Sequence, residues 1–477
     1  MMHANSASGG RPTTRTKVSG LVTPAGLAAA LLSAVIAAPA FSQDPDPGIA
    51  AGPVKITFGG YVELAAIYRS RNQSADMGSN FNTAIPYPNS SNYHIDEFRE
   101  SARQSRLSML AQGPQDGNGV AEGYFELDFL GAAPTANSNE SNSYNMRMRN
   151  IYATYRLKDS GFYFLAGQNW SLVTLEKKGM RARSEQVPLT IDAQYVPAFN
   201  WLRVPQIRLV KEFSKVSMGL SFETPQALLF NGPNKPLATP VFNNPGGSLY
   251  APTNNYSLDG APDITAKVAF DPKFGHYELY YTARQFRDRV SGSNHTESGG
   301  GVGAGMILPL SKKFDFQISG LFGDGIGRYA SAQFPDVTIK PDGTLSAISE
   351  SQVLAGINWR PTSKWTFYGY YGQEKASAEA FTAVVGGATL GYGYGSPLYD
   401  NSGCLTEGSA VCAANTRQID QATIGAWLKY YQGALGNLQF GFQVSHTKRE
   451  IFAGVGGDPN TDINIGMISF RFYPYQR

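Results

Sequence analysis

The residues of this 477-residue chain that could carry chemistry are charged side chains spaced two apart. In YNMRMRNIYATYRL, Arg147 and Arg149 alternate with two methionines, and in YFELDFL, Glu126 and Asp128 alternate with apolar residues. Successive side chains of an extended strand point to opposite faces, so each charged pair shares one face. Such faces need water, whereas the opposite faces need lipid or a second sheet. After Arg149 the alternation shifts, which a bulge or a subunit contact would explain.

Catalytic chemistry has weaker support in the sequence. A hydrolase needs a nucleophile or acid with a base in hydrogen-bond reach, and the one constellation that can be drawn is His446 with Ser445 and Asp420. Because Ser445 and His446 are neighbours in a predicted strand, they should point to opposite faces. The histidines show no HExxH spacing, and the glycine cluster GGGVGAGM opens a strand with no helix after it. We therefore expect no cofactor and no metal site.

The two cysteines, Cys404 and Cys412, lie in CLTEGSAVC within a long polar segment. They suit a disulfide bond in an oxidising compartment, and too few other ligands are near them for a metal.

Composition narrows the class of protein. The chain has 52 Gly, 26 Tyr and 27 Phe but only 16% charged residues, with a mean hydropathy of -0.26. It is too polar for a helical membrane protein and too aromatic for a typical cytosolic enzyme. Two Cys and five His argue against a disulfide scaffold or a zinc-rich module.

The amino terminus has the layout of a secretory signal peptide. Arg11, Arg15 and Lys17 precede the apolar run LVTPAGLAAALLSAVIAA, and small residues follow. We expect cleavage after Ala40 or Ser42 and favour the latter, which gives a signal peptide over 1–42; a membrane-anchoring helix is the alternative. Its removal takes three basic residues and leaves 37 basic against 37 acidic. That neutral balance gives no support for nucleic-acid binding.

The rest of the chain alternates in the manner of β-strands. ITFGGYVELAAIY is the first of several alternating segments, each about the 9–11 residues that a tilted membrane strand needs. Short connections such as KDSG and DPKFG alternate with long polar segments, including 70–100, 174–202, 290–299 and 377–415. A soluble sandwich has no reason to alternate its loops in this way. The pattern predicts an all-β transmembrane antiparallel β-barrel of sixteen strands, with short periplasmic turns and long extracellular loops. The barrel is expected over 56–477, after a short periplasmic segment over 43–55.

Several segments resemble one family of barrels. SRLSMLAQGP resembles the second-strand pattern of porins around an inward arginine. The combination of EGYFELDFLG, MRMRNIYATY and LAGQNWSLV is similar to the DcaP-like trimeric outer-membrane porins of the Gram-negative porin superfamily, and the resemblance is specific over about 56–173. The resemblance implies a homotrimeric, sixteen-stranded channel in outer-membrane lipid and lipopolysaccharide that passes small anionic organic acids, dicarboxylates among them. It also implies that the third long loop folds into the pore. One departure is the carboxyl end, FYPYQR, which lacks a terminal aromatic residue.

These observations predict a charged pore. The expected basic lining is Arg106, Arg147, Arg149 and Arg208, with Lys177, Lys178, Arg181 and Arg183 of the third loop. The expected acidic lining is Glu63, Glu126 and Asp128. Opposed rows of arginines and acids would set a transverse field, and an arginine excess would favour anions. In the alternative, the arginines pair with the acids and mainly hold the barrel rigid. Two other functions stay open: an outer-membrane protease or lipase, and a receptor barrel plugged by its loops.

Overall fold

The structure is a computed structural model that describes residues 48–78, 81, 84–131, 145–241 and 258–476. The predicted signal peptide, 1–42, lies outside the described residues. The described part of the chain contains no helix that is both long and apolar enough to cross a membrane.

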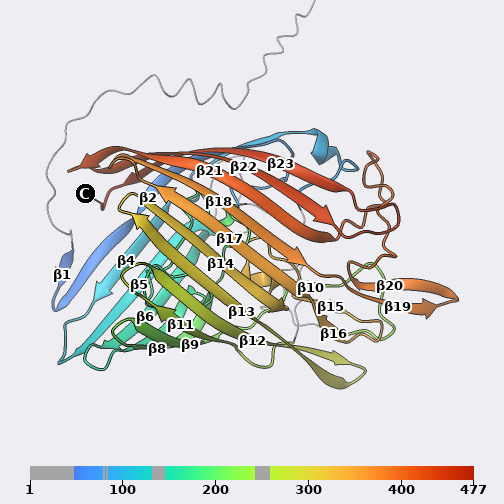
Figure 1. Ribbon diagram of the computed structural model, residues 1–477, viewed down its shortest axis with the longest axis horizontal. Helices are drawn as coiled ribbons and strands as arrows, with labels where there is room; N and C mark the ends of the chain where they lie inside the picture. Colours follow the sequence, from blue (N-terminus) through green and yellow to red (C-terminus); the bar gives the residue numbers. More distant parts are fainter. Residues whose placement is uncertain (1–47, 79–80, 82–83, 132–144, 242–257, 477) are drawn as a thin grey trace, which may run out of the picture. The chain divides into compact units, whose positions relative to one another are not determined.

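Sixteen antiparallel strands form a closed barrel (Figure 1), as the sequence predicts. Each strand pairs with its neighbours in the chain, and pairing of the first strand with the last closes the cylinder. The second strand is interrupted, because β3 and β4 both pair with β2. The barrel strands are β2 (Val54–Arg69), β3 (Glu97–Ser101), β4 (Arg106–Gln112), β5 (Gly119–Gly131), β6 (Asn145–Leu157), β7 (Phe162–Trp170), β8 (Arg203–Glu212), β9 (Val216–Glu223), β11 (Asp263–Phe270), β12 (His276–Val290), β13 (Ser293–Ser311), β14 (Phe314–Asp324), β17 (Ser349–Trp359), β18 (Trp365–Ala376), β21 (Thr416–Gly433), β22 (Gly436–Ile451) and β23 (Asn460–Tyr473).

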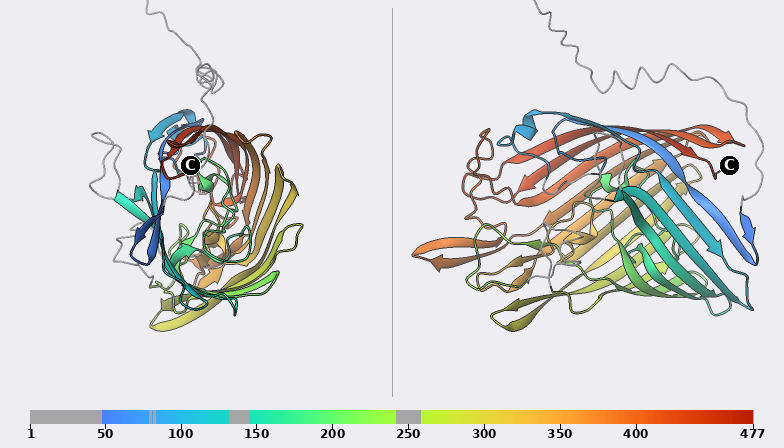
Figure 2. Two further views of the ribbon diagram at one scale, coloured as in Figure 1. Left: turned by 90° about the vertical axis from the view of Figure 1, so that its left-hand side faces the viewer. Right: turned by 180° about the vertical axis from the view of Figure 1, so that it is seen from behind.

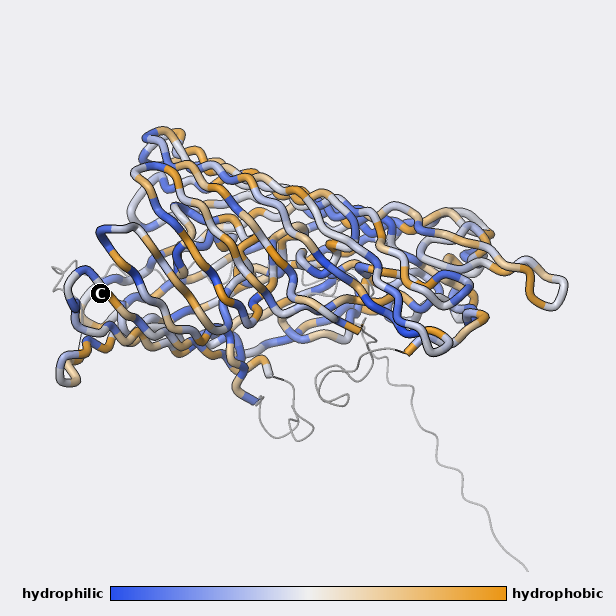
Figure 3. Tube along the Cα trace, turned by 90° about the horizontal axis from the view of Figure 1, so that it is seen from below, coloured by the Kyte–Doolittle hydropathy of each residue, from blue (hydrophilic) through white to orange (hydrophobic). Residues whose placement is uncertain are grey.

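The barrel wall has an apolar outer face and a polar inner face. In β11, Ile264, Val268 and Phe270 are exposed on the outside, while Thr265 and Lys267 are buried on the inside. Hydropathy alternates along the strands in the same way (Figure 3). This is the period of two expected for a strand between lipid and a polar lumen.

A bulge in β6 explains the shift in alternation after Arg149. Glu126 of β5 pairs with Asn150, and the next residue, Leu127, pairs with Met148, so Arg149 is an extra residue in the ladder. Arg149 and Asn150 are both buried, and Ile151 then points outward. One inserted residue reverses the faces of all that follow.

The long loops carry small elements of their own. β10 (Leu229–Phe230), β15 (Val337–Ile339) and β16 (Leu345–Ala347) form a three-stranded sheet, and β19 (Glu379–Val385) with β20 (Ala388–Tyr394) forms a hairpin. Short 3-10 helices lie at Ser91–His94, Ala193–Tyr195 and Gly327–Tyr329, and β1 (Ile49–Ala51) pairs with the start of β2.

The prediction of a long loop over 290–299 is wrong. β12 and β13 continue as a hairpin joined by Ser291 and Gly292, both with positive φ, as a tight turn requires. The segment is polar because a hairpin that extends past the membrane has water on both faces, so the sequence there loses its alternation.

Candidate functional site

The segment between β7 and β8, residues 171–202 and here called loop 3, lies inside the barrel. Its backbone contacts strands far around the cylinder: Leu189 N donates to Tyr370 Oη of β18 at 3.0 Å, and Ile191 N to Gln443 Oε1 of β22 at 2.9 Å. Trp427 Nε1 of β21 donates to Leu189 O at 2.6 Å. The end-on view in Figure 2 shows this coil within the ring of strands. Loop 3 therefore crosses the lumen and narrows it.

Glycines in the wall make room for loop 3. A Cβ added to Gly372 of β18 would clash with the carbonyl oxygen of Pro197 in the loop. A Cβ on Gly305 of β13 would lie 2.6 Å from Leu175, and one on Gly219 of β9 would lie 2.5 Å from Met180. The glycines of the strands thus include one position where the loop backbone approaches closely and two where loop side chains do.

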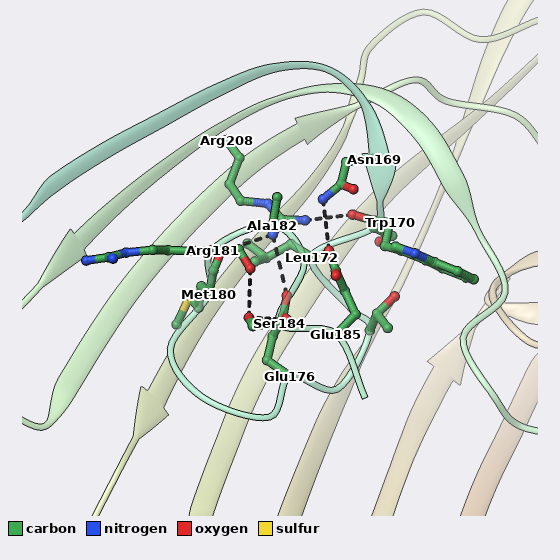
Figure 4. A network of polar contacts seen from close by, with 12 residues as sticks. Asn169, Trp170, Leu172, Glu176, Met180, Arg181, Ala182, Ser184, Glu185 and Arg208 are labelled. Carbon is green, nitrogen blue, oxygen red and sulfur yellow. Dashed lines mark hydrogen bonds and ion pairs between the residues drawn. The ribbon is translucent and has the colours of Figure 1, made fainter. Parts of the chain in front are cut away.

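A buried polar network joins β8 to the start of loop 3 (Figure 4). Arg208 is fully buried; its guanidinium donates to Trp170 O at 2.6 Å and Met180 O at 3.1 Å and lies 3.5 Å from Glu176 Oε1. Ser184 Oγ donates to Glu176 Oε2 at 2.7 Å. Arg208 was expected to line the pore, but it has no exposed surface because loop 3 covers it. It anchors loop 3 instead.

A second buried pair, on β11 and β12, binds the same part of the loop. Lys267 Nζ of β11 lies 2.8 Å from Glu278 Oε2 of β12, with both side chains fully buried. Lys267 also donates to Thr174 O at 2.8 Å, and Glu278 Oε1 accepts from Glu176 N at 3.0 Å. Charged side chains of β8, β11 and β12 thus bind the loop backbone, and each charge has a partner, as burial requires.

The arginines and acids of the early strands share one wall. Glu126 and Asp128 of β5 lie directly between Arg106 of β4 and the two arginines of β6. Arg149 Nε lies 2.6 Å from Glu126 Oε1, and its Nη1 lies 2.8 Å from Asp128 Oδ2. The expectation of opposed rows across the lumen is therefore wrong, because consecutive antiparallel strands are neighbours in a barrel.

The other predicted wall charges are also paired. Arg147 Nη2 lies 2.7 Å from Asp128 Oδ2, and Arg106 lies more loosely, 3.9 Å from Glu126 Oε1. Glu63 is buried elsewhere, on β2, where its Oε1 lies 3.0 Å from Arg471 Nε of β23. These contacts favour the rigid-wall alternative for most of the predicted residues.

The basic residues of loop 3 divide into two kinds. Arg181 pairs with Glu212 of β8 and Arg183 with Glu122 of β5, which tie the loop to the wall near the short-turn end. Lys177 and Lys178 are exposed, and no carboxylate in the described part of the chain pairs with either. The loop cations therefore lie toward one mouth of the barrel rather than in a single ring.

Arg203, which the sequence analysis missed, completes the charged wall. It begins β8, at the return end of loop 3, and its guanidinium carbon lies 4.7 Å from the ring centre of Trp170 and 5.1 Å from that of Trp201. The charges of Arg149, Arg147 and Arg106 act on it, and Glu126 partly offsets them. No carboxylate of the described residues forms an ion pair with it, and its Nη1 donates to no protein acceptor there.

Ser445, His446 and Asp420, the residues of the possible hydrolase site, do not come together. Ser445 is buried and shares a hydrogen bond of 2.8 Å with Thr423, whereas His446 is exposed on the outer face, 2.9 Å from Asn464 Oδ1. Asp420 pairs in the ladder with Lys448 and contacts Gln373 and Tyr371. Across the described ranges, no three His, Cys, Asp or Glu side chains gather as a metal site would require.

The two cysteines lie in the long loop between β20 and β21. A disulfide bond joins Cys404 to Cys412, and Asn89 N donates to Cys404 O at 3.0 Å. Tyr87 packs beside Cys404, and burial raises the pKa of its phenol to about 12, so it stays neutral. These contacts join the first long loop to the loop before β21.

A closed sixteen-stranded antiparallel barrel with an apolar outer face, a charged inner wall and an inward third loop defines the porin fold of outer-membrane barrels. The outer membrane channel DcaP of Acinetobacter baumannii has this fold: it matches with a TM-score of 0.62 at 16% identity, over 88% of this chain and 97% of that chain. The family resemblance is thus confirmed at the level of the fold.

Other solved structures are less similar. The trimer form of OmpT, an outer membrane protein of Vibrio cholerae, matches with a TM-score of 0.48 at 8% identity, over 88% of this chain and 100% of that chain. An anion-selective porin from Comamonas acidovorans matches with a TM-score of 0.45 at 11% identity, over 87% and 99%. No protein-family model and no curated protein sequence matches the chain.

Proposed function

We propose that this chain is an outer-membrane porin that lets small hydrophilic solutes diffuse and favours anionic organic acids such as dicarboxylates. The fold shared with an outer membrane channel supports the porin function. The exposed apolar outer face supports a place in outer-membrane lipid and lipopolysaccharide, reached by export with the signal peptide. A homotrimer is proposed on the family resemblance.

One observation carries the anion preference: three arginines share two carboxylates, and a fourth arginine beside them pairs with neither. The arginines are Arg106, Arg147, Arg149 and Arg203, here called the arginine cluster, and the carboxylates are Glu126 and Asp128. Guanidinium groups keep their charge throughout the physiological pH range, so the cluster has a net positive charge. Charged side chains that line a pore set its ion preference.

Dicarboxylates fit such a cluster for a chemical reason. A guanidinium pairs with a carboxylate through two parallel hydrogen bonds, and a solute with two carboxylates can engage two guanidiniums in turn. Arg203 and Arg106 are the members least neutralised by protein groups, since Arg203 has no carboxylate partner among the described residues and Arg106 has a distant one. These two are therefore the residues expected to meet the solute.

The test is planar-bilayer conductance of the refolded mature chain, with the reversal potential measured under a salt gradient. We expect an anion-preferring channel, and Arg203→Gln should move the reversal potential toward cation preference. The matched control is Arg417→Gln, because Arg417 pairs with Glu450 at the loop end of β21, away from the cluster.

The outcomes separate the functions. Absence of conductance in the wild type would overturn the open channel and favour the plugged receptor. Conductance without anion preference, or an equal shift in Arg203→Gln and Arg417→Gln, would keep the porin and overturn the role of the arginine cluster. Ester or peptide hydrolysis that is lost in His446→Ala would favour the barrel enzyme.

A further inference from the structure

A second cationic site lies at the short-turn end of the barrel, away from the arginine cluster. There, loop 3 and three of the turns surround a cavity of about 580 Å³, here called the rim cavity. The turns follow β8, β11 and β17, and short turns face the periplasm in barrels of this kind. Its basic lining is Lys177, Lys178, Lys215, Lys273 and Arg360.

The two carboxylates of the rim cavity already have partners. Asp271 Oδ1 lies 2.7 Å from His276 Nδ1, and its Oδ2 accepts from Gly179 N at 3.0 Å. Asp315 accepts from Asn358 Nδ2 at 2.7 Å and forms an ion pair with Arg360. Two carboxylates against four lysines and Arg360 leave the lining with a net positive charge.

The four lysines, by contrast, are exposed, and no carboxylate in the parts of the chain described by the structure pairs with any of them. They come from loop 3 and from two different turns, so their ammonium groups surround the cavity on several sides. Each ammonium offers three donors on a flexible stem and binds an oxyanion as a point charge. The volume is in the range of small-molecule sites.

We propose that the rim cavity binds small multivalent oxyanions, with di- and tricarboxylates as the class of ligand. A monovalent acid would meet one or two ammonium groups, whereas a multivalent one would bridge loop 3 and the rim. The inference rests on the proposed function for the solute class, because a solute of that class that leaves the channel would pass this cavity. Binding itself needs no open pore.

The first experiment is isothermal titration calorimetry of the refolded chain in detergent, with citrate as the multivalent probe and acetate as the monovalent one. We expect citrate to bind in preference to acetate and to weaken with added salt. Lys215→Gln with Lys273→Gln should weaken citrate binding by about tenfold or more, since two charge-assisted contacts are lost. Lys177→Gln with Lys178→Gln, which removes two charges of loop 3, should weaken citrate binding to a similar extent.

The matched control is Lys158→Gln with Lys364→Gln, which removes the same charge from turns at the same end without touching the cavity lining. Equal citrate affinity in the cavity variants and in the wild type would overturn the proposal, as would the absence of citrate binding to the wild type.

Arg203→Gln separates this inference from the proposed function. We expect it to alter the reversal potential, and to weaken citrate binding in detergent by less than the lysine variants do. If Arg203→Gln abolishes citrate binding and the lysine variants do not, the oxyanion site is the arginine cluster, and the rim cavity proposal fails while the porin stands. If the lysine variants lose citrate and no variant alters selectivity, the rim cavity stands and the role of the arginine cluster fails.

Discussion

Arg208 Nη1 and Glu176 Oε1 lie 3.5 Å apart with both side chains fully buried, and this pair joins the barrel wall to loop 3. The guanidinium also donates to the carbonyl oxygens of Trp170, the last residue of β7, and of Met180 in loop 3. A single side chain of β8 thus contacts two acceptors of loop 3 and one at the end of β7. The position of loop 3 depends on it.

Substitution of Arg208 should therefore lower the free energy of unfolding by more than a typical substitution in the barrel wall does. In Arg208→Met, Glu176 would stay buried without its countercharge, and we expect a loss of about 3–5 kcal/mol in the free energy of unfolding. The measurement is urea-dependent unfolding in lipid vesicles, followed by tryptophan fluorescence. The double variant Arg208→Met with Glu176→Gln has no unpaired buried charge at this position, so it should recover part of the free energy of unfolding that the single variant loses. A single variant as stable as the wild type would contradict the anchoring role.

Gly372 offers a test of how loop 3 packs against β18. A methyl group at this position would clash with the carbonyl oxygen of Pro197, so Gly372→Ala should displace the loop and destabilise the barrel by about 1–3 kcal/mol. The control is Gly369→Ala on the same strand, where the nearest heavy atom to a new Cβ would lie 3.5 Å away in ordinary contact.

Channel recordings provide a second readout for this pair of variants. Displacement of loop 3 should change single-channel conductance in Gly372→Ala and leave it unchanged in Gly369→Ala. Equal conductance in both variants would mean that the loop does not limit flow at this point.

The outer face gives a test of the membrane assignment. Val444 lies near the middle of β22, is 51% exposed and pairs with the exposed Ile424 of β21. Val444→Lys should cost about 2–4 kcal/mol if this position meets the bilayer midplane. His446→Lys, two residues nearer the strand end on the same face, should cost less. The free energy of folding into lipid vesicles measures both, and equal costs would contradict a depth-dependent lipid contact.

The barrel could be predicted because its signals are local. Side chains alternate with a period of two, and turns of Gly, Pro, Asn and Asp follow each strand, so strand after strand is visible in one sequence. The bulge at Arg149 was also visible as a shift in alternation. The hairpin around Ser291 was not, because both of its faces are polar and the period of two disappears.

The site was harder to predict because it depends on contacts between distant parts of the chain. Arg208 and Arg149 have the same residue type and the same inward direction, yet loop 3 covers one of them, and no sequence pattern specifies where a 32-residue loop lies. The role of Arg203 could not be predicted because this residue directly follows a predicted loop and belongs to no alternating pattern that marks it as inward. Lys215 and Lys273 lie in turns that resemble ordinary solvent-exposed connections in the sequence. Only the position of loop 3 in the fold brings them together around one cavity.

The disulfide bond at the loop end supplies a last prediction, about local rather than global stability. Cys404 and Cys412 close a separation of eight residues, which on the chain-entropy account stabilises the closed form by about 2–3 kcal/mol. The loop contacts the first long loop through Asn89, whose N donates to Cys404 O and whose O accepts from Gly408 N. Since these bonds lie outside the barrel ladder, Cys404→Ser with Cys412→Ser should loosen this loop and leave the unfolding of the barrel unchanged.

Limited chymotrypsin digestion of this double variant should cleave faster at Leu405, which is already 65% exposed. Wild-type protein treated with a reductant should match the variant, and a variant that resists cleavage as well as the oxidised wild type would show that hydrogen bonds hold the loop without the disulfide bond.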